Sequence, residues 1–188
     1  MTSKLSRALC AVSCALALAA CNDPNAVDAS IPTIADTLVV FAVNGTAPAA
    51  PSAWNAVTGA LSRTNGAFSW DLAFDIDDAG DARIMPLSSV AGPYSPRIVG
   101  VQRLSVAFDG LGRAPSSGYV LDSTFTVQPG EGVVLRINAE VCQLDFSPYR
   151  YAKLVVDSVD LPTRQLFIRT VRDPNCGFRS FEPGVPGS

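Results

Sequence analysis

Histidine is absent from the 188-residue chain, and Lys4 and Lys153 are its only lysines. Without an imidazole there is no Ser-His-Asp triad, no Cys-His pair, no histidine general base and no histidine ligand for zinc or haem. Lys153 lies in a stretch typical of a β-strand, where we expect a solvent-facing charge rather than a catalytic base. Paired carboxylates remain as a catalytic design, but a single sequence does not place them across a sheet. We therefore expect a protein that is not an enzyme.

Basic charge and long apolar runs are also scarce. The chain has 14 basic against 17 acidic side chains, a net charge of −3. A chain with this charge balance lacks the excess of basic side chains that attracts nucleic acid. The apolar run from Ala8 to Ala20 is too short to cross a bilayer as a helix, and no other run is longer. These features predict neither a nucleic-acid partner nor a membrane-spanning protein.

The amino terminus has the parts of an export signal. Lys4 and Arg7 precede the apolar run, which ends in Leu18-Ala19-Ala20-Cys21. This ending resembles the lipobox of bacterial lipoproteins, and the resemblance implies that Cys21 is diacylated, becomes the first residue and anchors the protein to a membrane. Asn22 resembles the lipoprotein pattern that permits transfer to an outer membrane. We expect a lipid-anchored protein of the bacterial cell envelope, at the outer membrane, with a plain secretory signal as the alternative.

Removal of residues 1–20 as the signal peptide leaves 168 of the 188 residues, a suitable length for one domain. The 14 basic residues lose Lys4 and Arg7, so 12 remain against 17 acidic ones and the net charge becomes −5. Residues 21–35, with two prolines and small polar side chains, predict a lipidated cysteine followed by a flexible tether. Residues 36–181 are the expected β-domain, and residues 182–188 are an expected frayed end.

The body of the chain alternates with period two. In residues 68–76 the even positions are apolar, which predicts a strand with its even positions in the core and its odd positions facing outward. Turn residues separate further β-rich runs, and only residues 52–62 suggest a helix, with a loop as the alternative. We expect an all-β fold, an antiparallel β-sandwich or barrel-like single domain. The further runs are residues 37–43, 98–108, 119–127, 133–137, 152–159 and 165–171.

Of the five cysteines, only two are expected to remain free to form a pair. Cys10 and Cys14 leave with the signal and Cys21 carries lipid, so Cys142 and Cys176 remain. Two thiols in an oxidising compartment predict a disulfide, which stabilises the fold by about 3 to 4 kcal/mol in the chain-entropy description. A metal or redox pair is the alternative, but there is no C-x-x-C and no histidine to complete it.

A cluster of aspartates, Asp75, Asp77, Asp78 and Asp81, raises the question of a calcium site. Set against an EF-hand loop, Asp75, Asp77 and Gly80 occupy the first, third and sixth places. However, Ala79 stands fifth and Pro86 stands twelfth, where the bidentate glutamate belongs. We expect a hairpin turn here and no cofactor, with a non-EF calcium loop as the alternative.

Aromatic residues gather near the expected disulfide. Phe146, Tyr149 and Tyr151 lie around Pro148, after Cys142, and Phe178 and Phe181 follow Cys176. Aromatic side chains near a loop can form a ligand platform, because they combine a large apolar area with a polar tip. They also pack around disulfides, which is the simpler interpretation.

One further resemblance concerns the mature domain. Ser69-Trp70-Asp71-Leu72-Ala73-Phe74 and Tyr151-Ala152-Lys153-Leu154-Val155-Val156 resemble the hairpin pattern of HmuY-type haem-capturing lipoproteins, which are all-β proteins. The resemblance implies an all-β fold. Haem ligation, which it also implies, would have to use Met85, the only methionine after the signal.

These observations leave two function classes. The first, which we favour, is a non-catalytic membrane-anchored lipoprotein that presents its β-domain to another envelope protein or serves as an accessory subunit. The second is a ligand-capture lipoprotein that holds a small molecule, haem or calcium through the aromatic group, Met85 or the aspartate cluster. A concave site lined by those residues would favour the second class, and a broad apolar patch the first.

Overall fold

The computed structural model describes residues 28–65, 69–92 and 95–187. The expected signal peptide, Cys21, Phe68 and Ser188 lie outside the described residues. Within the described ranges, no helix has both the length and the apolar character needed to cross a bilayer. The elements are β1 (Ile34–Phe41), β2 (Ala53–Trp54), β3 (Leu61–Ser62), β4 (Leu72–Ile76), β5 (Ala82–Pro86), α2 (Leu87–Ala91), β6 (Val99–Arg103), η2 (Phe108–Gly110), β7 (Phe125–Val127), β8 (Gly132–Asn138), η3 (Glu140–Cys142), β9 (Tyr149–Asp160) and β10 (Gln165–Asp173).

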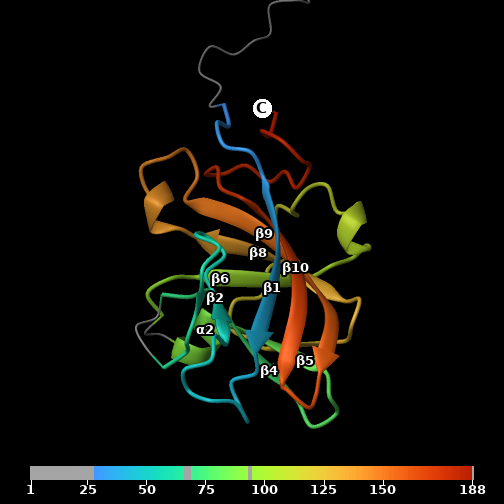
Figure 1. Cartoon of the computed structure of the whole chain (residues 1–188). Coiled ribbons are helices and arrows are strands. Elements are labelled where there is room, and N and C mark those ends of the chain that lie inside the picture. The colour runs from blue at the N-terminus through green and yellow to red at the C-terminus, as the bar shows by residue number, and fades with distance from the viewer. Residues whose placement is uncertain (1–27, 66–68, 93–94, 188) are drawn as a thin grey trace, which may run out of the picture.

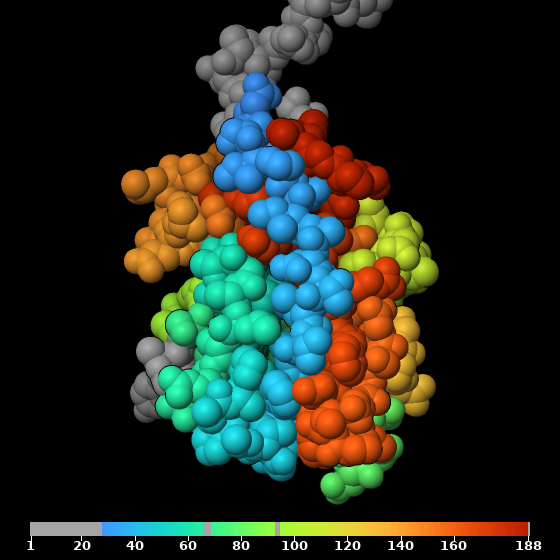
Figure 2. Space-filling model, viewed as in Figure 1, coloured from blue at the N-terminus to red at the C-terminus, as the bar shows by residue number. Residues whose placement is uncertain are grey.

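Two five-stranded sheets form a sandwich that is not closed into a barrel (Figure 1). Sheet A has the order β1-β10-β9-β8-β6 and sheet B the order β3-β2-β4-β5-β7, with antiparallel pairing throughout. At the end of β1 the chain joins the two sheets, since the Val43 amide donates to Phe74 O and the Ala42 amide to Arg164 O. In Figure 2 residues 28–43 accordingly form a strip between segments of both sheets. The predicted antiparallel β-sandwich is confirmed.

The main core lies between the sheets. From β9 it takes Ala152, Leu154 and Val156, each fully buried, because alternate residues of a strand point to one face. The predicted even positions of residues 70–76 are also buried: Trp70, Leu72, Phe74 and Ile76.

The odd positions of that strand do not face outward as predicted. Asp71 is 0 % exposed and Asp75 is 2 % exposed. Each aspartate is buried because a loop covers it and supplies its partners. The Ala56 amide donates to Asp71 Oδ2 at 2.7 Å, and Arg97 lies 3.4 Å from Asp71 Oδ1. The Asn44 amide donates to Asp75 Oδ1 at 3.2 Å.

A second apolar cluster covers the outer face of sheet A. It contains Ala114, Val134, Tyr151 and Phe181, contributed by β8, β9 and the segments that follow η2 and β10. This cover explains why the prediction of a solvent-facing Lys153 is wrong: the residue is 3 % exposed.

Three sequence-based boundaries change. Residues 52–62 are a tight hairpin of β2 and β3 rather than a helix, because the Asn55 side chain accepts hydrogen bonds from the Val57 and Thr58 amides and closes the turn. The strand expected over residues 98–108 ends at Arg103, since its partner β8 begins at Gly132. The strand expected over residues 119–127 is reduced to β7 and a single bridge between Val101 and Val120.

Both ends of the described chain are held to the domain at one end of the sandwich (Figure 1). The amides of Ser30 and Ile31, in the expected tether, donate to Asn175 Oδ1 at 3.0 Å. The Thr33 amide donates to Gly184 O at 2.9 Å, so the C-terminal segment expected to be frayed lies against the start of the chain. β1 begins at Ile34, two residues before the expected start of the β-domain.

Candidate functional site

A disulfide between Cys142 and Cys176 joins η3 to the segment after β10, as the sequence predicts, with 5.5 Å between the two Cα atoms. Residues 139–148, here called the disulfide loop, leave β8 and return to β9. The Ala139 amide donates to Pro148 O at 2.9 Å and closes the base of the loop. The Gly177 amide donates to Tyr149 O at 2.7 Å. The loop is thus fixed by a covalent bond and by backbone hydrogen bonds on both sides.

The tip of the disulfide loop exposes apolar side chains. Leu144 is fully exposed at 101 %, Val141 is 61 % exposed and Phe146 is 60 % exposed. Two carboxylates, Glu140 and Asp145, are exposed on the same loop. The loop is the orange segment that projects from the upper left of the molecule in Figures 1 and 2. An exposed group of large apolar side chains with a polar rim is typical of an interaction surface.

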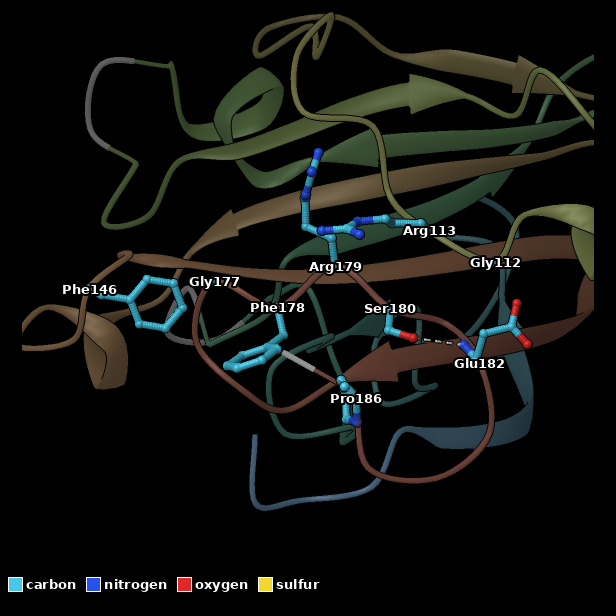
Figure 3. A pocket seen from close by; sticks show the side chains of 10 residues that line it. Gly112, Arg113, Phe146, Gly177, Phe178, Arg179, Ser180, Glu182 and Pro186 are labelled. Atoms are coloured by element: carbon cyan, nitrogen blue, oxygen red, sulfur yellow. Dashed lines mark hydrogen bonds between the residues drawn. The ribbon is translucent and has the colours of Figure 1, made fainter. Parts of the chain in front are cut away.

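A pocket of about 630 Å³ lies beside the disulfide loop (Figure 3). We call it the arginine pocket. Phe146 and Phe178 line one part of it, with an edge-to-face contact and 5.8 Å between their ring centroids. The pocket is lined by Gly112, Arg113, Phe146, Gly177, Phe178, Arg179, Ser180, Glu182, Pro186 and Gly187.

Backbone pairing positions the two arginines of this pocket. The Ala114 amide donates to Arg179 O at 2.8 Å and the Phe181 amide donates to Gly112 O at 2.8 Å. Arg113 and Ser180 form the bridge between these two chain segments. In the view of Figure 3 both arginine side chains lie above Phe178 and Ser180. The arrangement places two cationic groups on one wall of the pocket, which suits an anionic group.

The predicted aromatic group is divided. Phe146 and Phe178 line the arginine pocket, whereas Tyr149 and Tyr151 belong to the second apolar cluster. The guanidinium carbon of Arg136 lies 4.7 Å from the Tyr149 ring centroid and 4.9 Å from that of Tyr119, so it is stacked between the two rings. Burial raises the pKa of the Tyr151 hydroxyl. Packing explains these two tyrosines.

Phe181 and Met85 lie apart from the pocket. Phe181 is 5 % exposed in the second cluster. Met85 lies in β5 of sheet B and packs against the main core between the sheets. The structure therefore does not bring Met85 together with Phe146, Tyr149 or Tyr151.

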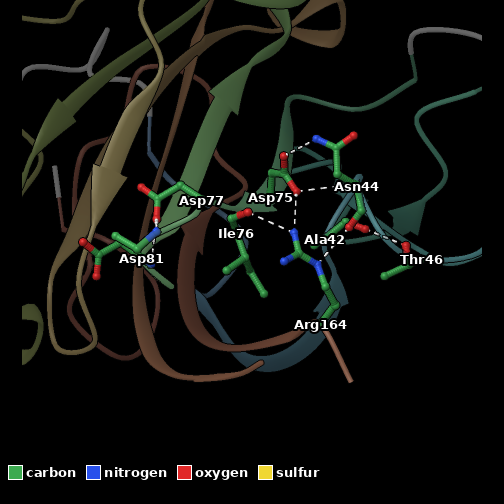
Figure 4. Close-up of polar contacts among 9 residues, drawn as sticks. Ala42, Asn44, Thr46, Asp75, Ile76, Asp77, Asp81 and Arg164 are labelled. Carbon is green, nitrogen blue, oxygen red and sulfur yellow. Dashed lines mark hydrogen bonds and ion pairs between the residues drawn. The ribbon is translucent and has the colours of Figure 1, made fainter. Parts of the chain in front are cut away.

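The aspartate cluster forms the β4–β5 hairpin turn (Figure 4). Asp77 Oδ1 accepts hydrogen bonds of 3.0 Å from the Ala79 and Asp81 amides, which is ordinary turn chemistry. Asp75, by contrast, is held by Asn44 and by an ion pair of 3.3 Å with Arg164. Asp78 is exposed and Asp81 half-buried.

In the described part of the chain, only Cys142, Asp145 and Cys176 bring three potential metal-ligand atoms within 4.8 Å of one another, and the two sulfurs are already bonded to each other. The four aspartates of the hairpin turn do not form such a group.

Sequence reasoning did not find Arg113 or Arg179. Each follows a glycine within two residues, Gly112 and Gly177 respectively, but no pattern in the sequence pairs these distant segments. The pairing arises because the disulfide and the second apolar cluster bring the C-terminal segment across sheet A. Comparisons with protein-family models, with curated proteins and with solved structures give no match, so the interpretation depends on the geometry of the site itself.

Proposed function

We propose that this protein is a non-catalytic lipoprotein of the bacterial envelope that presents its disulfide loop to another envelope protein. The lipobox-like residues 18–21 support the anchor, and Asn22 supports the outer membrane as its location. The observation that carries the proposed contact is the exposed apolar tip of the loop, where Leu144 is fully exposed.

The loop suits a contact because it is fixed before binding. The Cys142–Cys176 disulfide and the hydrogen bond at its base hold Val141, Leu144 and Phe146 in place. Pre-organisation of this kind lowers the conformational entropy that is lost when a complex forms. Glu140 and Asp145 lie among these apolar side chains. The partner we propose therefore has an apolar depression with a basic rim.

A non-catalytic role agrees with the residues available. The chain has no histidine, and Lys153 Nζ donates hydrogen bonds to Phe108 O at 2.6 Å and Leu111 O at 2.9 Å. Those contacts bury the ammonium, so it has no access to a substrate.

The start of the described chain and the disulfide loop lie at the same end of the domain. The amides of Ser30 and Ile31 bind Asn175, which is adjacent to Cys176 of the disulfide. A lipid on Cys21 would thus hold the loop near the membrane surface, within reach of proteins embedded in it.

The anchor is tested by membrane fractionation. Cys21→Ala is expected to move the protein from the membrane to the soluble fraction. Full retention of the variant in the membrane would contradict the anchor.

The contact is tested by placing a photo-crosslinking residue at position 144 in cells. Leu161 supplies a matched control, because it is 53 % exposed and lies in the β9–β10 turn. We expect one discrete adduct from position 144, absent from position 161 and removed when Phe146→Ser is added. Equal adducts from both positions, or none from position 144, would contradict the proposed contact.

Ligand capture is the second candidate function, and the HmuY-type resemblance implies it. The specific observation in its favour is the arginine pocket, a concave site lined by Phe146 and Phe178 from the predicted aromatic group.

A further inference from the structure

We propose that the arginine pocket binds a small oxyanion, a carboxylate or a phosphate, carried on a flat apolar body. Arg113 and Arg179 would hold the anion, and Phe178 with Phe146 would contact the body. The pocket shares Phe146 with the proposed protein contact, but its two arginines lie outside the disulfide loop, and it defines the chemistry of ligand capture.

The charge of the pocket is the first support. The chain is acidic overall, yet two arginines line this one wall. Within the described ranges, the ion pairs involve Arg97, Arg103, Arg164 and Arg169, and neither Arg113 nor Arg179. Arg179 Nη1 donates only to the backbone oxygen of Ala114, at 3.4 Å. Two guanidinium groups without a carboxylate partner are suited to an anion that comes from outside the chain.

The fixed backbone around the arginines is the second support. The segments that carry Arg113 and Arg179 are paired through hydrogen bonds of 2.8 Å on either side of the Arg113–Ser180 bridge. The disulfide at Cys176 fixes the chain three residues before Arg179. An anion therefore meets arginines whose backbone is already ordered, which lowers the entropy lost on binding.

Ser180 adds a polar group to the same wall. Its Oγ accepts a hydrogen bond of 3.2 Å from the Glu182 amide, and this leaves the hydroxyl hydrogen to donate. The hydroxyl is thus a further donor for an anion between the arginines.

The aromatic wall determines what carries the anion. Phe178 is half-buried and Phe146 is 60 % exposed, and their rings meet at 90°. A Cβ at Gly177 would lie 2.5 Å from the Phe146 ring, so the glycine allows this close approach. Ring faces and edges next to cationic groups favour a ligand with a flat apolar part. The pocket volume of about 630 Å³ is in the range of small-molecule sites.

Glu182 limits the charge of the ligand. It lines the same pocket, and its carboxylate opposes in part the burial that lowers the pKa of the Lys153 ammonium. A second negative charge at that end of a ligand would be repelled. The site therefore favours one anionic group at one end of the molecule.

The test uses the mature lipidated protein in a non-ionic detergent, titrated with phenyl phosphate and followed by calorimetry. Inorganic phosphate supplies the charge alone and phenol the ring alone. We expect phenyl phosphate to bind more tightly than either. Arg113→Gln and Arg179→Gln should each raise its Kd by about tenfold, since each removes a charged hydrogen-bond donor. Phe178→Leu should raise the Kd of phenyl phosphate and leave that of inorganic phosphate unchanged.

The control is Arg63→Gln, which removes an exposed arginine after β3 and should not change binding. Arg113 is itself exposed, so its variant should fold, and circular dichroism verifies this. Absence of phenyl phosphate binding would overturn the proposal. An equal effect of Arg63→Gln and Arg113→Gln would also overturn it, because binding would then depend only on net charge.

Two sources of the oxyanion are separated by competition. In the same detergent, displacement of phenyl phosphate by phosphatidylglycerol in mixed micelles, but not by phosphatidylcholine in mixed micelles, would assign the site to a lipid headgroup. No displacement by either would assign it to a diffusing molecule.

A separate variant distinguishes this inference from the proposed function. Leu144→Ser leaves the pocket lining intact. Loss of the protein contact in that variant, with unchanged binding of phenyl phosphate, would show that the two proposals stand or fall independently.

Discussion

The ammonium nitrogen of Lys153 lies 4.4 Å from the centroid of the Phe108 ring and donates a hydrogen bond of 2.6 Å to the backbone oxygen of the same residue. This double contact fixes η2 on the outer face of β9. The two contacts also stabilise the ammonium of a residue that is only 3 % exposed, although burial lowers the pKa of Lys153. The one lysine of the expected mature chain is therefore a structural residue.

Replacing Lys153 by methionine keeps most of its volume but removes both hydrogen bonds. Leu111 O would lose the lysine donor and Phe108 O would keep only the Leu111 amide at 3.4 Å, so we expect the free energy of unfolding to fall by about 1 to 3 kcal/mol. Urea unfolding followed by tryptophan fluorescence measures it. Arg169→Met is the control, because Arg169 also lies over the Phe108 ring but is 43 % exposed. Unchanged stability of Lys153→Met would show that the contact contributes nothing.

Asp71 should make stability depend on pH. Burial raises the pKa of its carboxyl above the usual 3.8, and Arg97 opposes this only in part. Because the folded pKa exceeds the unfolded one, the resulting stability is fully present below pH 3.8 and is lost as pH rises through the folded value. The free energy of unfolding of the wild type minus that of Asp71→Asn should therefore decrease from about pH 3 to about pH 7.

Chemical denaturation at several pH values measures this difference. Asp78→Asn, at an exposed position of the hairpin turn, controls for the change in net charge. A difference that stays constant, or that increases with pH, would contradict the assigned direction.

The disulfide should be a major source of stability. Cys142→Ser is expected to lower the free energy of unfolding by about 3 to 4 kcal/mol, because the bond closes a loop between residues 34 apart in sequence. Cys176 should then react with a thiol reagent, as peptide mapping would show. Reaction of Cys176 in the native, unreduced wild type would instead mean that the bond does not form.

Gly132 should not tolerate a side chain. A Cβ built there would lie 2.0 Å from Leu154 O and 2.9 Å from Val155 Cα, both in the backbone of the neighbouring strand β9. Gly132→Ala is thus expected to force β8 from β9 and to lower stability by about 1 to 3 kcal/mol or more. Gly110→Ala is the matched control, since the nearest atom to its Cβ would be Val106 Cγ2 at 4.0 Å. Equal melting temperatures of the two variants would refute the expected clash.

The strands and the disulfide could be predicted because their signals are local or compositional. Alternation over residues 70–76 identified the core positions Trp70, Leu72, Phe74 and Ile76. Once the expected signal and lipid attachment account for three of the five cysteines, Cys142 and Cys176 allow only one pairing. In both cases neighbouring residues or a simple count contain the needed information.

The burial of Asp71 and Lys153 could not be predicted from alternation, because it depends on segments that lie far away in sequence. β9 nevertheless contains a signal: Tyr151 to Val156 are all buried, and an apolar run without alternation is typical of a strand covered on both faces. The arginine pocket has no such signal, since its walls come from residues 112–113, 146 and 177–187.

The attachment of the chain start to Asn175 determines how the domain responds to pulling. Asn175 binds the amides of Ser30 and Ile31, is braced by Asp173, and is followed by Cys176, whose sulfur is bonded to Cys142. Tension between residue 28 and Leu144 thus has a short mechanical path along one end of the molecule. Apart from Asp173 at the end of β10, the strands lie outside this path, so tension on the tether acts on the Asn175 hydrogen bonds, next to the disulfide, before it acts on the paired strands of the core.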